Sequence, residues 1–224
     1  MHINHLSYTF PKAHQPFFDQ VSFDLVSPGI NFLIGHNGAG KTTLADILTG
    51  LRSASGTDKL PTDAIYLNQS LPMLSSIRVR DVAQLVLGIE TGQTHLSLAD
   101  LTRRVDVATS AYLTPIWDQH YRELSGGQRK LVQLLLFLQV DRSLVVLDEP
   151  TAAVDRENVK LLFSVMAAHP QRTYLMITHD VRDIRAFTDY QVLWLRDRQI
   201  TGMTPTEFLE NSTNADFLTA FQEI

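Results

Sequence analysis

The stretch Gly35-His36-Asn37-Gly38-Ala39-Gly40-Lys41-Thr42 decides the fold of this 224-residue chain. An apolar run at residues 29–34 precedes it and predicts a strand, while residues 41–48 have the spacing of a helix. Glycines let backbone N–H groups approach a triphosphate without interfering side chains, and the start of a helix favours an anion. We therefore expect a phosphate-binding loop in which Lys41 adds charge and the Thr42 hydroxyl reaches Mg²⁺. The alternative is a glycine-rich turn without a ligand.

Further apolar runs predict more strands in the rest of the chain. They cover residues 64–67, 144–147, 173–178 and 192–195. Helical patterns alternate with these runs, which favours an α/β fold with a largely parallel sheet covered on both faces. Short alternating patterns in residues 3–25 indicate an additional antiparallel β part.

A helical segment interrupts this alternation. Val82, Leu85, Val86 and Ile89 recur at helical spacing, and residues 91–94 break the pattern. We expect one domain over residues 1–224. Its nucleotide-binding core comprises residues 1–70, which include the antiparallel part, and residues 141–224, and an α-helical subdomain is inserted at residues 71–140.

The composition narrows the class of protein. Lys and Arg number 19 against 24 Asp and Glu, a net charge of −5 without a long basic block, so we expect no nucleic-acid partner. The longest apolar run in the middle of the chain, residues 134–138, is far shorter than the ~20 residues of a membrane-spanning helix. The N-terminus lacks the pattern of a secretory signal and the chain has no cysteine, which together predict a cytoplasmic location.

Two carboxylates follow the apolar run at residues 144–147. Asp148 and Glu149 would lie at the mouth of a buried strand, beside the phosphates. Adjacent residues at the end of a strand point in different directions. We therefore expect Asp148 to hold the Mg²⁺ shell and Glu149 to polarise the water that attacks the γ-phosphate. The alternative for the pair is a capping role before Pro150.

A second anion-binding pattern is Leu124-Ser125-Gly126-Gly127-Gln128. Because it begins a helix, its N–H groups and the Ser125 hydroxyl form a site for an anion. One chain does not need two phosphate loops for one ATP. The alternative is a helix cap with a flexible entry.

These motifs, in this order and with His179 further on, resemble the ATP-binding cassette (ABC) family over about residues 3–203. The resemblance implies the ATPase subunit of a membrane transporter, which docks on a separate permease at the cytoplasmic face of the membrane. It also implies a head-to-tail dimer, either with a second copy or with another ABC subunit. In such a dimer residues 125–128 cap the γ-phosphate that the other subunit holds.

The resemblance implies roles for further residues. Gln69 corresponds to a glutamine whose amide reaches Mg²⁺ and water, and His179 to a switch histidine at the γ-phosphate. Asp155 would lie along the dimer seam, and Phe10 would stack on adenine, with Tyr8 as the competing candidate. The expected cofactors are ATP and Mg²⁺. The expected site is catalytic Glu149, His179 and Gln69, metal-binding Thr42, Gln69 and Asp148, and nucleotide-binding Phe10, Gly35, Asn37, Gly38, Ala39, Gly40, Lys41, Thr42, Thr43, Ser125, Gly126, Gly127, Gln128 and Asp155.

The chain departs from the family pattern in three places. The spacing from Lys41 to Gln69 is short, His36 replaces a more familiar residue of the loop, and the adenine-stacking aromatic is Phe10. None of these changes removes a catalytic group. Two other functions remain open at this stage, a soluble ABC ATPase of translation, repair or chromosome organisation and a regulatory protein with an inactive site. Apolar residues after Gln69 either line a groove for a permease helix or pack in a core, namely Leu71, Met73, Leu74 and Ile77.

Overall fold

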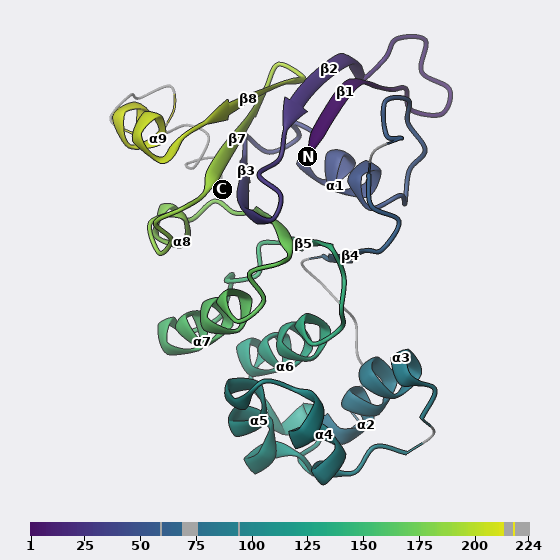
Figure 1. The fold of residues 1–224 in the computed structure, drawn as a ribbon, viewed down its shortest axis with the longest axis vertical. Coiled ribbons are helices and arrows are strands. Elements are labelled where there is room, and N and C mark those ends of the chain that lie inside the picture. Colours follow the sequence, from purple (N-terminus) through teal and green to yellow (C-terminus); the bar gives the residue numbers. More distant parts are fainter. Residues whose placement is uncertain (59, 69–75, 94, 213–216, 218–224) are drawn as a thin grey trace. The chain divides into compact units, whose positions relative to one another are not determined.

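The computed structural model describes residues 1–58, 60–68, 76–93, 95–212 and 217 (Figure 1). Two compact units make up the chain. The first, here called the sheet unit, comprises Met1–Asn68, Arg142–Glu149 and Gln171–Ile224. The second, here called the helical unit, comprises Gln69–Asp141 and Pro150–Pro170.

A six-stranded sheet in the order β4-β5-β6-β3-β7-β8 forms the centre of the sheet unit (Figure 1). The first five strands pair in parallel, and β8 is antiparallel to β7. The first four residues of β5 are all buried, as the continuous apolar run requires when both faces of a parallel sheet are covered. The strands are β3 (Gly29–Ile34), β4 (Ala64–Leu67), β5 (Leu144–Asp148), β6 (Thr173–Ile177), β7 (Gln191–Arg196) and β8 (Gln199–Met203).

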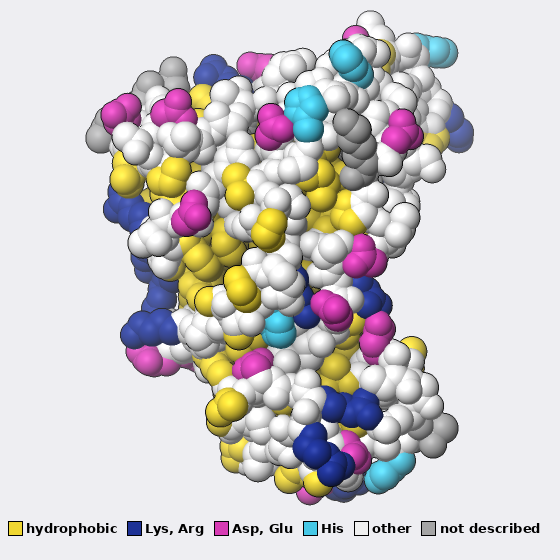
Figure 2. All heavy atoms as spheres, viewed as in Figure 1, with side chains coloured by type: hydrophobic (Ala, Val, Ile, Leu, Met, Phe, Trp, Pro, Cys, Tyr) yellow, Lys and Arg dark blue, Asp and Glu magenta, His cyan; other side chains and the backbone are white. Residues whose placement is uncertain are grey.

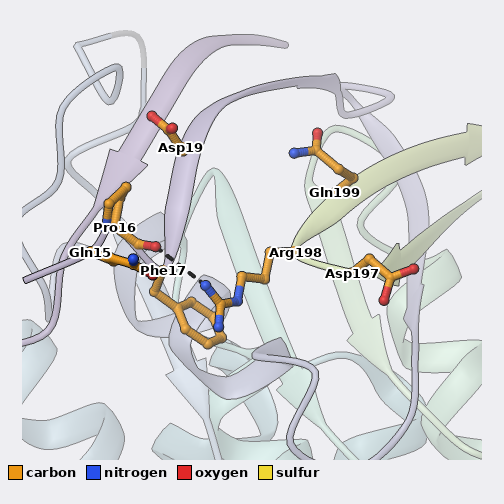
Figure 3. Close-up of a pocket in the computed structure, with 7 residues that line it drawn as sticks. All are labelled: Gln15, Pro16, Phe17, Asp19, Asp197, Arg198 and Gln199. Atoms are coloured by element: carbon orange, nitrogen blue, oxygen red, sulfur yellow. Dashed lines mark hydrogen bonds between the residues drawn. The ribbon is translucent and has the colours of Figure 1, made fainter. Parts of the chain in front are cut away.

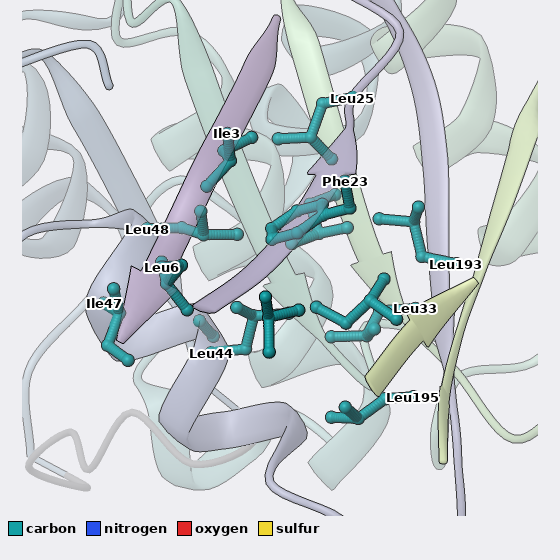
Figure 4. Packing of buried hydrophobic residues seen from close by; sticks show 14 of the residues in the cluster. Ile3, Leu6, Phe23, Leu25, Leu33, Leu44, Ile47, Leu48, Leu193 and Leu195 are labelled. Atoms are coloured by element: carbon teal, nitrogen blue, oxygen red, sulfur yellow. The ribbon is translucent and has the colours of Figure 1, made fainter. Parts of the chain in front are cut away.

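A two-stranded antiparallel sheet, β1 (His2–Tyr8) and β2 (Phe18–Asp24), completes the β structure of this unit. Its inward side chains pack in one hydrophobic core with helix α1 (Lys41–Leu48) and strands β3 and β7 (Figure 4). The core therefore fixes the helix that follows the phosphate loop. Residues that meet there include Ile3, Leu6, Phe23, Leu25, Leu33, Leu44, Ile47, Leu48, Leu193 and Leu195.

Two further helices belong to the sheet unit, α8 (Val181–Ile184) and α9 (Pro205–Asn211). Thr204 is the N-cap of helix α9: its side chain accepts a hydrogen bond from the Glu207 N–H, and the Glu207 carboxylate accepts one from the Thr204 N–H. This capping box satisfies N–H groups at the start of α9 and so favours the change from strand β8 to a helix.

The helical unit has its own core of apolar side chains, with Leu101, Leu113, Val132 and Leu136 fully buried. The long helices α6 and α7 pack against each other and against α5. Its helices are α2 (Val79–Ala83), π-helix η1 (Gln84–Gly88), α3 (Ile89–Thr91), α4 (Leu98–Arg104), α5 (Val107–Leu113), 3₁₀ helices η2 (Thr114–Ile116) and η3 (Tyr121–Glu123), α6 (Gly126–Leu138) and α7 (Arg156–Ala167).

The α/β fold class predicted from the sequence is confirmed, and the predicted strands match to within a residue or so at each end. The predicted division of the chain differs from these units at residues 150–170, and by one or two residues at the other boundaries. The sequence predicts that residues 141–224 all belong to the nucleotide-binding core, whereas Pro150–Pro170 group with the helices. The physical reason is that the apolar stripe of α7 packs on α5 and α6.

The helices of the described residues are short or polar. None of them is both long and apolar enough to traverse a lipid bilayer. On the face shown in Figure 2, acidic and basic side chains are interspersed, and several groups of Lys and Arg lie beside Asp or Glu.

Candidate nucleotide site

The phosphate loop connects β3 to α1 through glycines with special backbone geometry. Gly38 has φ 80° and Gly40 has φ 109°, in the left-handed region that favours glycine. A Cβ at Gly40 would lie 2.5 Å from Cε1 of Phe17, and one at Gly35 would lie 2.5 Å from the carbonyl oxygen of Leu195. The loop therefore has no room for side chains where it approaches β7 and Phe17.

Lys41 closes the loop with its ammonium group. Nζ donates hydrogen bonds to the carbonyl oxygens of Gly35 at 2.6 Å and His36 at 3.1 Å, and the residue is only 9% exposed. Burial lowers the pKa of Lys41, while the charges of Asp148 and Glu149 act in the opposite direction. The cation thus lies inside the loop, between backbone carbonyls and two acidic residues.

Asp148 ends β5 in the same sheet. The hydroxyl of Tyr66 on β4 donates a hydrogen bond to Asp148 Oδ2 at 2.8 Å. Burial raises the pKa of Asp148 above its ordinary value; Glu149 adds to the increase, whereas Tyr66, Lys41 and His179 oppose it. Burial and the nearby Asp148 charge raise the pKa of Tyr66, so its hydroxyl remains a donor. The surroundings of Asp148 therefore compensate its negative charge incompletely.

Glu149 and His179 form a pair at the ends of adjacent strands. Glu149 Oε1 lies 3.2 Å from His179 Nε2, and both side chains are partly exposed. The backbone of Glu149 has φ 47°, and its N–H donates to the carbonyl oxygen of Ile177 at 2.9 Å. Because that hydrogen bond ties the residue after β5 to the last residue of β6, both side chains lie at the carboxyl edge of the sheet.

A buried hydrogen-bond network positions the segment that carries His179. The Thr178 hydroxyl donates to Asp183 Oδ2 at 3.0 Å, and Asp183 is fully buried. The same hydroxyl oxygen accepts from the Asp180 N–H at 3.0 Å, while the Asp180 carboxylate accepts from the Arg182 N–H at the start of α8. Thr178 and Asp183 were not among the predicted site residues, because nothing in the Thr178-His179-Asp180 pattern marks a partner in the following helix.

Aromatic side chains gather beside the loop. The rings of Tyr8 and Phe10 are 5.0 Å apart, and those of Phe10 and Phe17 are 5.1 Å apart, each pair edge to face. Tyr8 is buried and its hydroxyl accepts a hydrogen bond from Arg52 at 3.0 Å, whereas Phe10 is only partly buried. Phe10 is therefore the more accessible of the two adenine-stacking candidates.

A pocket of about 330 Å³ lies beside Phe17 (Figure 3). The guanidinium of Arg198, in the turn between β7 and β8, lies 5.3 Å from the centre of the Phe17 ring. Both turn residues have positive φ, 50° at Asp197 and 63° at Arg198. The lining residues are Gln15, Pro16, Phe17, Asp19, Asp197, Arg198 and Gln199, and no sequence motif identifies them.

The Ser125 segment begins α6 in the helical unit. The Ser125 hydroxyl accepts from the Gln128 N–H at 3.2 Å, and Gln128 Oε1 accepts from the Ser125 N–H at 2.9 Å. This capping box stabilises the first turn of α6. Ser125 therefore has the capping role that the sequence offers as an alternative to anion binding. Ser125 and Gly126 are also exposed, which leaves the tip of the helix accessible.

Residues 151–155 lie against this first turn within the same unit. A side chain at Gly127 would collide with the carbonyl oxygen of Ala153, and Lys130 Nζ donates to the carbonyl oxygen of Ala152 at 3.1 Å. Asp155 is the N-cap of α7, and its side chain accepts a hydrogen bond from the Asn158 N–H at 3.0 Å. The close contact between Gly127 and the backbone of Ala153 therefore requires a glycine at position 127, independently of the anion-binding pattern at residues 124–128.

Some predicted residues lie outside the described part of the chain. They include Gln69 and three of the apolar residues expected to face either a permease or a core, Leu71, Met73 and Leu74. The fourth, Ile77, is partly buried and packs against the core of the helical unit. For Ile77 the structure therefore favours core packing.

The phosphate loop after β3 and the two carboxylates at the end of β5 define a P-loop nucleoside triphosphatase. A family model described as ABC transporter matches residues 18–152, more than half of the chain, so the chain belongs to this family.

Relatives of known description agree with this assignment. The chain is 28% identical to the energy-coupling factor transporter ATP-binding protein EcfA1 of Lacticaseibacillus paracasei, over 93% of this chain and 80% of the relative. It is 30% identical to EcfA2 of Halalkalibacterium halodurans, over 84% of this chain and 74% of the relative. It is 29% identical to the high-affinity zinc uptake system ATP-binding protein ZnuC of Bacillus subtilis, over 80% of this chain and 85% of the relative.

Solved structures share the fold. A nucleotide-free ATP-binding cassette from an ABC transporter superposes with a TM-score of 0.73 at 21% identity, over 99% of both chains. The chain is thus an ATP-binding and ATP-hydrolysing subunit of an ABC transporter, and the relatives favour this function over a soluble ABC ATPase outside transport.

Proposed function

We propose that two copies of this chain bind two Mg²⁺·ATP between them, head to tail, and drive import through a separate permease at the cytoplasmic face of the membrane. The convergence of Lys41, Asp148, Glu149 and His179 on the carboxyl edge of one sheet carries the proposal. The zinc uptake protein among the relatives supports import as the direction.

The triphosphate would bind at the loop of residues 35–42. In the described structure Lys41 satisfies its ammonium with two neutral carbonyl oxygens. Phosphate oxygens are stronger acceptors because they carry charge, so a bound nucleotide favours the charged form of Lys41 that burial disfavours. Backbone N–H groups at the start of α1, including those of Thr42 and Thr43, and the loop residues Asn37 and Ala39 complete the expected phosphate site.

The residues near the loop fit a magnesium ion. Mg²⁺ prefers oxygen ligands and commonly uses one or two protein groups together with phosphates and water. Asp148 offers an incompletely compensated carboxylate, and the Thr42 hydroxyl lies beside the Tyr66 hydroxyl that Asp148 holds. When bound, the metal would neutralise charge on the β- and γ-phosphates. Gln69 would complete this set.

Glu149 would orient and polarise the attacking water. Its contact with His179 Nε2 at 3.2 Å restricts the carboxylate, and the network from Thr178 to Asp183 restricts the histidine in turn. His179 would also contact the γ-phosphate. Phe10 would stack on adenine through its partly exposed ring.

The exposed tip of α6 would serve the other copy of the chain. N–H groups at the tip, from Gly126 to Gln128, together with the Ser125 hydroxyl, would bind the γ-phosphate held by the partner loop. Asp155 would lie along the same seam. ATP would then stabilise the closed pair because only that state provides these contacts.

A complementation experiment tests the pairing. Ser125→Arg should retain ATP binding and lose cooperative hydrolysis, and Glu149→Gln should also bind ATP without turnover. In a mixture, a head-to-tail pair places both substitutions in one site and leaves the other site intact, so hydrolysis should return. A mixture no more active than its components would contradict the shared site.

A matched control variant distinguishes the two roles of Ser125, anion binding and helix capping. Ser97 caps α4 with the same reciprocal pattern, its side chain accepting from the Asp100 N–H at 3.2 Å. Ser97→Arg should lower thermal stability through the lost cap and leave hydrolysis near the wild-type rate. Equal losses of hydrolysis in the two variants would assign Ser125 a capping role alone.

A further inference from the structure

Tyr66 has a position in the sheet that no sequence motif assigns to the site. It lies on β4 opposite Val146 of β5, and Asp148 follows two residues further along β5. Because side chains two residues apart share a face of a strand, Val146 and Asp148 point to the same side of the sheet. The long side chain of Tyr66 reaches along that face to the carboxylate of Asp148.

The Tyr66 hydroxyl joins the two protein groups proposed to bind magnesium. It donates to Asp148 Oδ2 at 2.8 Å, and the Thr42 side chain lies close enough to the Tyr66 hydroxyl to oppose the rise in the pKa of Tyr66. Thr42 begins α1 and Asp148 ends β5, so Tyr66 links elements far apart in the sequence. The hydrogen bond from Tyr66 engages Oδ2 of Asp148. The other carboxylate oxygen, Oδ1, is then available to bind the metal.

We propose that Tyr66 is a positioning residue for the metal: its hydroxyl orients the Asp148 carboxylate and the Thr42 hydroxyl before Mg²⁺·nucleotide binds. The inference rests on the proposed roles of Asp148 and Thr42. Removing a residue that hydrogen-bonds to a metal ligand typically weakens metal affinity about 10- to 100-fold, because the ligand loses its orientation. A tyrosine that only satisfies a buried polar group would affect stability alone.

Tyr66→Phe tests the role because it removes the hydroxyl and keeps the ring. Mn²⁺ affinity, measured by electron paramagnetic resonance in the presence of ADP, should weaken about tenfold. The Mg²⁺ concentration that half-saturates hydrolysis should rise by a similar factor. ADP affinity in EDTA should remain at the wild-type value, since the phosphate loop is intact.

Tyr174→Phe is the matched control. Tyr174 is a buried tyrosine on β6 of the same sheet, and its hydroxyl bonds to the Arg172 side chain. Both variants should keep their circular dichroism spectra, and only Tyr66→Phe should change Mn²⁺ affinity. Wild-type Mn²⁺ affinity in Tyr66→Phe, or an equal loss in Tyr174→Phe, would overturn the inference.

A double-mutant cycle with Asp148→Asn separates this inference from the proposed function. If Tyr66 acts through Asp148, adding Tyr66→Phe to Asp148→Asn should weaken Mn²⁺ binding much less than it does in the wild type. If Asp148→Asn alone leaves Mn²⁺ affinity unchanged, the proposed metal site is wrong and this inference fails with it. If Asp148→Asn weakens binding while Tyr66→Phe does not, only the role of Tyr66 is contradicted.

Discussion

Asp100 of the helical unit and Asp148 of the sheet unit are carboxylates in contrasting surroundings. Asp100 accepts hydrogen bonds from the Ser97 N–H at 3.0 Å and from Arg103 Nη2 at 2.6 Å, and it also bonds to the Ser97 hydroxyl. The Ser97 hydroxyl, the Ser97 backbone and Arg103 lower the pKa of Asp100 to about 2. Burial instead raises the pKa of Asp148, although Tyr66 donates to it.

The opposite directions distinguish a carboxylate whose ionised form folding favours, Asp100, from the carboxylate proposed to bind a metal, Asp148. Folding favours the ionised form of Asp100, so this residue stabilises the protein above its ordinary pKa of 3.8, and the contribution is lost as the pH falls towards 2. Folding disfavours the ionised form of Asp148. Its contribution is present below its ordinary pKa and is lost as the pH rises through the folded value. A cation beside Asp148 would therefore favour the ionised form that burial disfavours.

The largest expected difference between substitutions in the two units is in the rate of ATP hydrolysis. Glu149→Gln should release phosphate about 10²-fold more slowly or worse, because the amide is a poor base, while ATP binding and the nucleotide-bound dimer persist. Glu123 provides the comparison in the helical unit, where its carboxylate accepts from the His120 N–H at 2.7 Å. Glu123→Gln should hydrolyse ATP at the wild-type rate. Normal phosphate release by Glu149→Gln would reject its assignment.

A smaller effect is expected for the structural aspartate. Asp100→Asn should lower the melting temperature at pH 7, because the neutral amide is a weaker partner for Ser97 and Arg103. The difference from wild type should shrink as the pH falls from about 4 to about 2. Thermal scans over this range measure it. A difference that stays constant with pH would show that the charge of Asp100 is not the stabilising feature.

The sequence predicts most of the sheet unit because its signals are local. The apolar run before Asp148 and the glycines at positions 38 and 40 each reflect a physical requirement within a few residues, burial on both faces of β5 and positive φ in the loop. The capping boxes at Ser125 and Thr204 are equally local.

Contacts between residues far apart in the sequence cannot be predicted from such local patterns. Tyr66 is one of several half-buried residues in a four-residue strand, and only its pairing opposite Val146 brings it to Asp148. Asp183 looks like a first-turn residue of α8, and its burial against Thr178 arises from packing. The grouping of residues 150–170 with the helices likewise depends on which helices α7 meets.

The melting temperatures of wild type and Asp148→Asn, measured at pH 7 in EDTA and again with saturating Mg²⁺·ADP, test most directly whether Asp148 is held for a cation. We predict that the variant melts above wild type in EDTA, because an incompletely compensated charge is gone, and gains less from Mg²⁺·ADP. A variant that melts below wild type in EDTA and gains as much from Mg²⁺·ADP would contradict the account.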